Sequence, residues 1–185
     1  MGPKFGYCRN PQTTAGFIRQ FYKEVQVSPQ EVEYVEAYGT GVPDADKSEL
    51  EALEEVYCKD RQDPLPVGSV TSNIGLTEAA SGMAAITKVL LGYHTGQIAA
   101  NLHCSSPRQD VVALREGRMC IVTDHQRFRR TYVAINGMSF SGVNSHVLLH
   151  GHYKPKDLSR YQASIPRLVT LSGRQESAIT KILEN

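Results

Sequence analysis

Val-Gly-Ser-Val-Thr-Ser-Asn-Ile-Gly-Leu-Thr-Glu-Ala-Ala-Ser-Gly, residues 67–82, decides the fold of this chain when it is taken together with Glu-Ala-Tyr-Gly-Thr-Gly at residues 36–41. The stretch at residues 36–41 begins at the end of an alternating, β-branched segment, Val32 to Ala37. This segment predicts a strand that runs directly into a glycine loop. The junction of a strand and a glycine-rich loop is a common place for an active site in α/β proteins. In the stretch at residues 67–82, we expect a short strand at 67–70 and then a helix that begins near Thr77.

The rest of the chain continues this alternation of helices and strands, which is typical of an α/β fold. Apolar spacing predicts helices over residues 11–26, about 46–58 and 77–93, and strands over 32–37, 67–70, 119–123, 131–136 and 145–151. Asp44 or Asp46 is expected to cap the second helix, and Gly96 is expected to end the third. The third helix is rich in small residues, which allow close backbone packing, so we expect it to be deeply buried.

Length and composition restrict the class of protein. The 185 residues suffice for one domain with a substantial core and the beginning of another. A composition of 41% hydrophobic and 21% charged residues, with a net charge of +1, gives no support for nucleic-acid or membrane-surface binding. No apolar run reaches the length of about 18 residues that spans a bilayer, and the first ten residues contain no signal-peptide core. The four cysteines lack the spacing of a disulfide scaffold, so reduced thiols in the cytoplasm are expected.

The character of the chain changes after Gly151. A polar connector begins there, and Arg167-Leu-Val-Thr-Leu-Ser-Gly173 then predicts a new strand that enters another helix. We therefore place a domain boundary near residue 152, which separates residues 1–151 from residues 152–185.

The two opening stretches resemble the active-site loops of a β-ketoacyl synthase, which in that family read E-A-H-G-T-G-T and K-S-N-I-G-H-T-E. Asn101 to Pro107 resembles the family's N-L-H-x-x-S-P, and Asn136 to Leu149 resembles its N-S-F-G-F-G-G-S-N-x-H-x-I-L. Each motif alone is weak evidence, but four motifs in the right order at compatible spacing make the resemblance specific. The amino-acid sequence of these segments most resembles that of the condensing domain of the animal type I fatty acid synthase.

This resemblance implies the thiolase-like fold, in which a mixed sheet is sandwiched by helices. Residues 1–151 would be the C-terminal half of the condensing domain, and residues 152–185 would begin the linker to an acyltransferase. The family's substrates are carried on the phosphopantetheine of an acyl carrier protein, so the expected partners are that carrier, the remaining synthase domains or a second copy of the chain. No cofactor bound by the chain itself is expected. Half of such a fold would expose apolar surface, which predicts poor solubility or association with a partner.

The positions that carry the family's chemistry have changed. Tyr38 and Leu76 stand where the family has its two histidines, and Thr71 stands in place of its lysine. Leu76 cannot donate a hydrogen bond, and Tyr38, with an ordinary pKa of about 10, cannot act as a neutral imidazole. No catalytic residue of the family is intact, and its cysteine nucleophile belongs to the N-terminal half. Tyr38 and Leu76 either fill the vacated pocket, which we favour, or Tyr38 polarises a carbonyl in place of histidine.

Other candidate residues have weaker support. Thr40, Phe140 and Asn144 are candidates for contact with an acyl chain or pantetheine arm. Cys104 lies in a Cys-Ser-Ser sequence like that of a nucleophile, but its position after Asn101 favours a structural role. The pair His150 and His152 lacks a third ligand, so no metal site is expected. Three hypotheses follow: an inactive condensing-enzyme fragment, an active condensing enzyme within a larger chain or complex, and a non-catalytic module that binds acyl groups or carrier protein.

Overall fold

The structure is a computed structural model that describes residues 10–152, 170 and 175–183. The chain divides into two units, Met1–Tyr153 and Lys154–Asn185, and each is described by itself. The second unit contains the helix α6 (Glu176–Leu183). The strand expected at 167–173 falls outside the described residues except for residue 170, so that strand and the role of this unit as a linker stay predictions.

The first unit is built on a five-stranded mixed sheet with the strand order β4-β2-β1-β6-β7. Four of its strands run parallel, and β7 pairs antiparallel with β6 to form a hairpin. The strands are β1 (Val32–Glu36), β2 (Leu65–Gly68), β4 (Met119–Ile121), β6 (Tyr132–Met138) and β7 (Asn144–His150). Every strand predicted before residue 152 is therefore present. The two-stranded sheet of β3 (Gln97–Ile98) and β5 (Gln126–Arg127) was not predicted.

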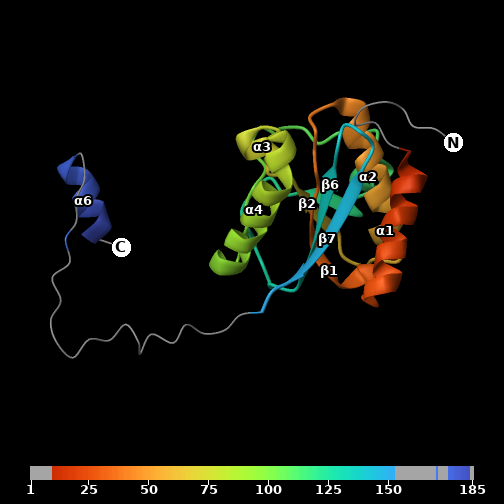
Figure 1. Cartoon of the computed structure of the whole chain (residues 1–185), viewed down its shortest axis with the longest axis horizontal. Helices are drawn as coiled ribbons and strands as arrows, with labels where there is room; N and C mark the ends of the chain where they lie inside the picture. The colour runs from red at the N-terminus through yellow and green to blue at the C-terminus, as the bar shows by residue number, and fades with distance from the viewer. Residues whose placement is uncertain (1–9, 153–169, 171–174, 184–185) are drawn as a thin grey trace. The chain divides into compact units, whose positions relative to one another are not determined.

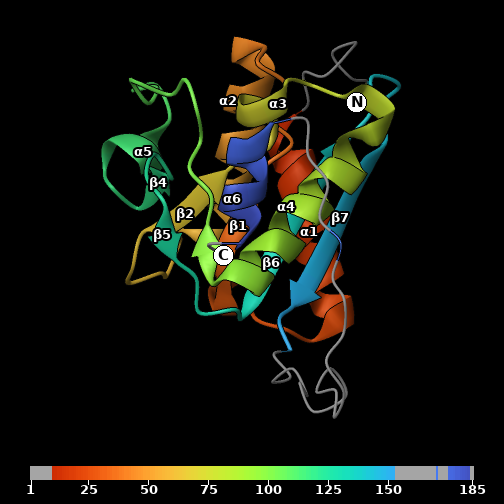
Figure 2. The same ribbon diagram turned by 90° about the vertical axis from the view of Figure 1, so that its left-hand side faces the viewer.

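Helices cover both faces of this sheet, as the fold class requires (Figure 1). The helices are α1 (Pro11–Val25), α2 (Pro43–Tyr57), α3 (Thr71–Ile74), α4 (Ser81–Thr95) and α5 (Val112–Arg115), with 3₁₀ turns at Pro29–Glu31 and Glu78–Ala80. On one face, α1 and α2 pack against each other over one core, whereas α4 packs over a second core on the other face. Figure 2 looks onto this second face, with α3 and α4 in front of the strands. Alternate residues of β6 serve the two cores, since Ala134 joins the first and Val133 and Ile135 join the second.

The ends of the helices differ partly from expectation. The helix α2 begins at Pro43 with Val42 in the cap position, so the prediction of an Asp44 or Asp46 cap is wrong. Proline suits the first helical position because its missing N–H would have no partner there. Asp46 instead accepts hydrogen bonds from the loop before the helix. Gly96 ends α4 in the left-handed conformation, with φ of 75°, as predicted.

The prediction that α4 is deeply buried is wrong, because only one side of it packs on the sheet. Ser81, Ala85, Val89 and Gly92 form that side. Met83, Leu90 and Leu91 are between 54% and 66% exposed, so the outer side of the helix is apolar. The small residues Ala79 and Ala80 lie in the preceding 3₁₀ turn and do not extend a single stripe along α4. The exposed apolar surface expected of half a thiolase-like fold is therefore present on this helix. Within the described part of the chain, no helix is long and apolar enough to cross a membrane.

Candidate functional site

The loops that follow β1 and β2 lie side by side, because these strands are parallel neighbours and their carboxyl ends meet at one edge of the sheet. The amide of Ala37 donates to the carbonyl of Gly68 at 2.7 Å. The hydroxyls of Ser69 and Thr71 both donate to the carbonyl of Tyr38, at 3.1 and 3.0 Å. The structure thus brings the two loops together at the place where the sequence predicts an active site.

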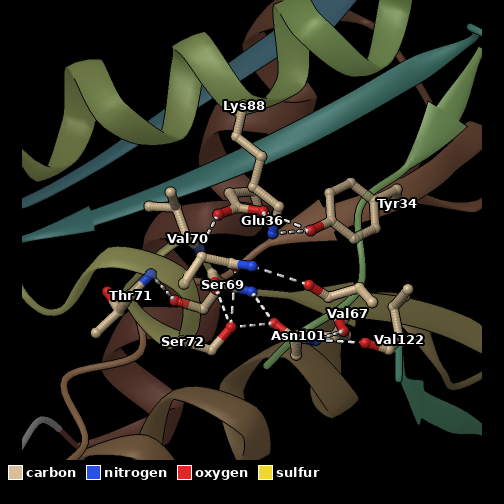
Figure 3. A network of polar contacts seen from close by, with 12 residues as sticks. Tyr34, Glu36, Val67, Ser69, Val70, Thr71, Ser72, Lys88, Asn101 and Val122 are labelled. Atoms are coloured by element: carbon tan, nitrogen blue, oxygen red, sulfur yellow. Dashed lines mark hydrogen bonds and ion pairs between the residues drawn. The ribbon is translucent and has the colours of Figure 1, made fainter. Parts of the chain in front are cut away.

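A third motif joins this site through the buried side chain of Asn101 (Figure 3). Its Oδ1 accepts from the amide of Ser69 at 2.8 Å and from the hydroxyl of Ser72 at 3.1 Å. Its Nδ2 donates to the carbonyls of Val67 and Val122, at 3.3 and 2.9 Å. Asn101 therefore fixes the second loop against the ends of β2 and β4.

Beneath the loops, a buried ion pair connects β1 with α4 (Figure 3). Lys88 Nζ lies 2.8 Å from Glu36 Oε2, and these side chains are 10% and 0% exposed. Tyr34 donates its hydroxyl to the same carboxylate and accepts from Lys88 at 3.0 Å. The amide of Val70 donates to Glu36 Oε1 at 2.5 Å. Glu36 thus accepts hydrogen bonds from β1, α4 and the second loop at once, so both oxygens of its buried carboxylate have partners.

Two carboxylates of α2 hold the first loop by its backbone. Glu49 accepts from the amides of Tyr38 and Gly39, at 2.9 and 3.1 Å. Burial raises the pKa of Glu49, and hydrogen bonds from Asn136, Gly39 and Tyr38 oppose that rise. Asp46 accepts from the amide and hydroxyl of Thr40, at 2.7 and 2.8 Å, and from the amide of Gly41 at 3.1 Å. The conformation of residues 38–41 is therefore set by two acidic side chains that accept hydrogen bonds from the backbone of the loop.

The fourth motif reaches the site through Asn136 and His146. Asn136 Nδ2 donates to Glu49 Oε1 at 3.0 Å, so its Oδ1 accepts from Nδ1 of His146 at 2.7 Å. This arrangement leaves Nε2 of the neutral imidazole to accept from the hydroxyl of Tyr57 at 3.2 Å. Tyr57 is also within 2.9 Å of the hydroxyl of Tyr22. A continuous chain of hydrogen bonds therefore runs from the first loop into the core between α1, α2 and β7.

Because His146 is buried, its neutral form is favoured and its pKa falls to about 4. The unfolded chain takes up this proton below about pH 6.5, whereas the folded chain resists it until about pH 4. We expect the free energy of unfolding to be highest above pH 6.5 and to decline by about 3 kcal/mol between pH 6.5 and 4 through this residue. Urea titrations followed by circular dichroism at several pH values measure the decline.

The variant His146→Gln isolates this contribution, since glutamine can hydrogen-bond but does not titrate. Its stability is expected to be lower than that of the native chain above pH 6.5 and to depend less steeply on pH below it. Equal slopes in the two proteins between pH 6.5 and 4 would contradict the assignment.

Tyr38, Thr71 and Leu76 stand at the three positions that differ from the family's catalytic residues, and each lies in a different setting. The side chain of Tyr38 is 5% exposed, and its carbonyl receives the two hydroxyl bonds described above. Thr71 turns its hydroxyl into the structure to make one of those bonds. Leu76 is half-buried, and along the chain it lies between α3 and the following 3₁₀ turn. Tyr38 and Thr71 therefore lie together, joined by the bond from the hydroxyl of Thr71 to the carbonyl of Tyr38.

The candidates for acyl or pantetheine contact lie in different settings. Thr40 is buried, and its hydroxyl donates to Asp46 and accepts from the amide of Val42 at 3.0 Å. Phe140 lies at the turn between β6 and β7 and is 68% exposed. Asn144 begins β7, where its Oδ1 is buried without a hydrogen-bond partner among the described residues. Their role in binding stays a prediction.

Cys104 lines a cavity of about 190 Å³ between the two loops. The carboxylates of Asp46 and Glu49 line the same cavity. The residues that line this cavity include no His, Lys or Arg, the side chains that activate a cysteine nucleophile. Cavities that hold small molecules are larger, about 300 Å³ or more. This environment supports the structural interpretation of Cys104.

The histidine pair near residue 150 lies at the end of β7. The ring of His150 packs against that of Tyr132, with 4.5 Å between the ring centroids. In the part of the chain that the structure describes, no three His, Cys, Asp or Glu side chains come together as metal ligands would.

The sequence motifs locate the site but do not reveal the side chains that join it. Glu36 and Asn136 each match the first letter of a family motif, and Lys88 interrupts an apolar run, but no motif says which side chains these residues contact. One signal was available: a charged residue in a predicted buried strand and a lone lysine in a small-residue helix both require partners. Their pairing could not be predicted without the topology.

Comparisons with known proteins agree with this geometry. Residues 4–105 match the family described as "Beta-ketoacyl synthase, C-terminal domain", and residues 107–185 match "Ketoacyl-synthetase C-terminal extension". The chain is 36% identical over 139 residues to a highly reducing polyketide synthase of Aspergillus terreus, covering 72% of this chain and 5% of that protein. It is 34% identical over 178 residues to one of Alternaria alternata, covering 94% of this chain and 6% of that protein.

Solved structures show the same relationship. The ketosynthase domain KS7 of the oxazolomycin protein OzmH from Streptomyces albus superposes with a TM-score of 0.75 at 26% identity, over 84% of this chain and 28% of that one. The ketosynthase from module 6 of the Bacillus subtilis bacillaene synthase superposes with a TM-score of 0.74 at 26% identity, over 83% and 29%. This chain thus spans less than a third of each of these ketosynthases and a small part of the curated synthases. The chain belongs to the β-ketoacyl synthase family, as the counterpart of the C-terminal part of its thiolase-like condensing domain.

Proposed function

We propose that this chain is a non-catalytic member of the ketoacyl synthase family, which keeps the scaffold of the active-site loops and has lost decarboxylating condensation. The observation that carries the proposal is the state of Tyr38, Thr71 and Leu76. Tyr38 is buried, the hydroxyl of Thr71 is donated to the backbone, and Leu76 has no polar side-chain atom. Stabilising an oxyanion requires donors aimed at the reacting group, and each such donor contributes about 3 to 4 kcal/mol. The engaged hydroxyl of Thr71 and the apolar side chain of Leu76 support the loss of such a set of donors.

The substrate class that this ancestry supports is an acyl or malonyl thioester on the phosphopantetheine of an acyl carrier protein. Both curated relatives named above are polyketide synthases. This favours a polyketide-type synthase over the animal fatty acid synthase that the motif sequences predicted. The proposed partners are the carrier protein and other parts of such a synthase, in the cytoplasm.

A malonyl decarboxylation assay tests the loss of activity. Incubated with malonyl-pantetheine or malonyl carrier protein, the chain is expected to release no carbon dioxide above a blank without protein, because both histidine positions of the family hold other residues. The matched variant Tyr38→Phe removes only a hydroxyl and should behave identically. Turnover by the native chain that Tyr38→Phe abolishes would overturn the proposal and establish Tyr38 as a substitute for histidine.

The assay should be repeated after the chain is mixed with the N-terminal half of a ketosynthase that contains the cysteine nucleophile. The chain covers 28–29% of the two solved ketosynthases described above, which leaves room for activity that depends on another part of a synthase. Turnover that appears only in the mixture would also overturn the proposal, in favour of an active condensing enzyme assembled from parts.

A second candidate function is the binding of acyl groups or carrier protein without catalysis. The observation that favours it is the hairpin turn between β6 and β7, where Phe140 and Val143 are largely exposed. Large apolar side chains that gather at an exposed turn are typical of contact sites. Calorimetric titration with acyl-pantetheine and with acyl carrier protein tests this candidate, and heat that Phe140→Ser removes would support it. Failure to bind either probe at millimolar concentration would exclude it.

A further inference from the structure

The buried carboxyl group of Glu49 is held by hydrogen-bond donors. Its Oε1 accepts from the amide of Tyr38 at 2.9 Å and from Nδ2 of Asn136 at 3.0 Å, and its Oε2 accepts from the amide of Gly39 at 3.1 Å. These three bonds satisfy a carboxylate. A carboxylic acid has a proton of its own and also needs an acceptor for it, which none of the three bonds offers.

The surroundings of Glu49 favour proton uptake as the pH falls. Burial raises the pKa of Glu49 by more than its hydrogen bonds lower it, and the charge of Asp46 on the same helix raises it further. The other side chains that bring polar groups to it are uncharged: Asn136 of β6, Thr14 of α1, and Asn144 and Ser145 of β7. A buried acid with this environment needs a defined place for its proton.

The amide of Asn136 supplies that place if it turns over. Half a turn of the amide exchanges Oδ1 and Nδ2 and leaves the positions of the neighbouring groups almost unchanged. Oδ1 then accepts the proton on Oε1 of Glu49, and Nδ2 donates to Nδ1 of His146, which lies 2.7 Å from the amide. A ring nitrogen that accepts a hydrogen bond carries no proton, so the neutral imidazole must then hold its proton on Nε2.

The far end of this chain of hydrogen bonds is able to reverse as well. Nε2 of His146 lies 3.2 Å from the hydroxyl of Tyr57, which lies 2.9 Å from that of Tyr22. Burial raises the pKa of Tyr22 to about 12 and that of Tyr57 well above its ordinary value, so both hydroxyls keep their protons while Glu49 titrates. A hydroxyl donates or accepts, so Tyr57 can serve either tautomer of the imidazole. Phe21 packs edge-on against the imidazole at 4.9 Å and brings no charge to it.

We propose that Asn136 is a switch that couples the protonation of Glu49 to the tautomer of His146. When Glu49 is charged, Asn136 donates to it and the imidazole proton is on Nδ1. When Glu49 is neutral, the amide is reversed and the imidazole proton is on Nε2. Glu49 takes one proton from water, whereas the imidazole loses one at Nδ1 and gains one at Nε2, so the whole chain gains one proton.

The switch leaves the first loop in place and carries information away from it. The carboxyl oxygens can accept from the amides of Tyr38 and Gly39 in both states, so the loop at residues 38–41 keeps these two bonds. The protonation of a group beside that loop is thereby transmitted to the core between α1, α2 and β7. This coupling goes beyond the proposed function and does not depend on whether the chain is catalytic.

Nuclear magnetic resonance of the full chain tests the proposal, with isotope labels in the glutamate carboxyl carbons and the histidine ring nitrogens. The pH is lowered from neutral to about 4, where His146 itself gains a proton. The Nδ1–H form of His146 is expected to fall from nearly the whole population to a small part of it, with the same midpoint as the protonation of Glu49. A tautomer that stays constant while Glu49 titrates overturns the proposal, since the carboxyl proton then has another acceptor, such as Oδ1 of Asn144. A Glu49 that stays charged until His146 is protonated, or neutral throughout, overturns it too.

Two variants and a control locate the coupling. In Glu49→Gln no carboxyl group titrates at this place, so the tautomer of His146 should stay constant over the same range. In Asn136→Ala the link is removed, so Glu49 should titrate without moving the ring proton. The control Asn73→Ala removes an exposed asparagine and should keep the native behaviour. A tautomer change with the native midpoint in Glu49→Gln or Asn136→Ala would overturn the role of Asn136, and the two curves of the native chain decide the matter if a variant fails to fold.

Discussion

Replacing Lys88 by methionine is expected to lower the free energy of unfolding by about 3 to 5 kcal/mol. Lys88 lies 2.8 Å from Glu36, whose side chain is completely buried. Methionine has nearly the same length as lysine, so the loss comes mainly from the uncompensated carboxylate and not from a cavity. The amide of Val70 and the hydroxyl of Tyr34 would still contact Glu36, but neither carries a charge. Urea denaturation followed by circular dichroism measures the change.

Two further variants separate the buried pair from a general effect of charge. Lys47 forms ion pairs with Glu51 and Asp110 at the surface, so Lys47→Met should change stability by no more than about 1 kcal/mol. The double variant Lys88→Met/Glu36→Gln removes both charges and should recover much of the loss. Equal losses for Lys88→Met and Lys47→Met, or no recovery in the double variant, would show that the ion pair is not what stabilises this region.

Asn101→Ala is expected to lower the free energy of unfolding by about 3 to 4 kcal/mol, an effect almost as large as that of Lys88→Met. The side chain of Asn101 joins Ser69, Ser72, Val67 and Val122 by hydrogen bonds in a buried setting. Alanine would leave these polar groups with fewer partners and would open a space where water is largely excluded. Hydrogen exchange of the Ser69 amide should accelerate in the variant, because this N–H donates to Asn101.

Asn73→Ala provides the matched control. Asn73 is exposed and makes a side-chain bond to the carbonyl of Ala100 at 3.1 Å. Its loss should change stability by no more than about 0.5 kcal/mol. If Asn73→Ala proves as damaging as Asn101→Ala, burial and the number of bonds would not explain the role of Asn101.

The elements of the sheet were predictable because their signals are local. The β-branched run at Val32–Glu36 and the apolar runs of β6 and β7 mark strands wherever they occur in a chain. The short pieces β3, β5, α3 and α5 were missed because four or fewer residues carry no usable periodicity. The degree of burial of α4 was also missed, since small residues permit close packing on either side of a helix and do not say which side is covered.

The place of the site was predictable, but the contacts that support it were not. The residues Tyr38, Thr71 and Leu76 could be found from motif order alone. The sequence contains Asp46 and Glu49 shortly after the first loop, but no local rule indicates that their carboxylates bind the amides of residues 38–41. Those bonds depend on where α2 turns back against the loop.

By itself, the sequence determined the family, the α/β class, the positions of the main strands along the chain and the loss of both imidazoles, because motifs and periodic patterns are properties of neighbouring residues. Only the tertiary structure decided which distant groups meet. The pairing of Glu36 with Lys88, the convergence of bonds on Asn101 and the chain from Glu49 to His146 each join residues from separate elements. Buried polar groups must find partners, and the parallel order of β4, β2, β1 and β6 determines which partners are within reach.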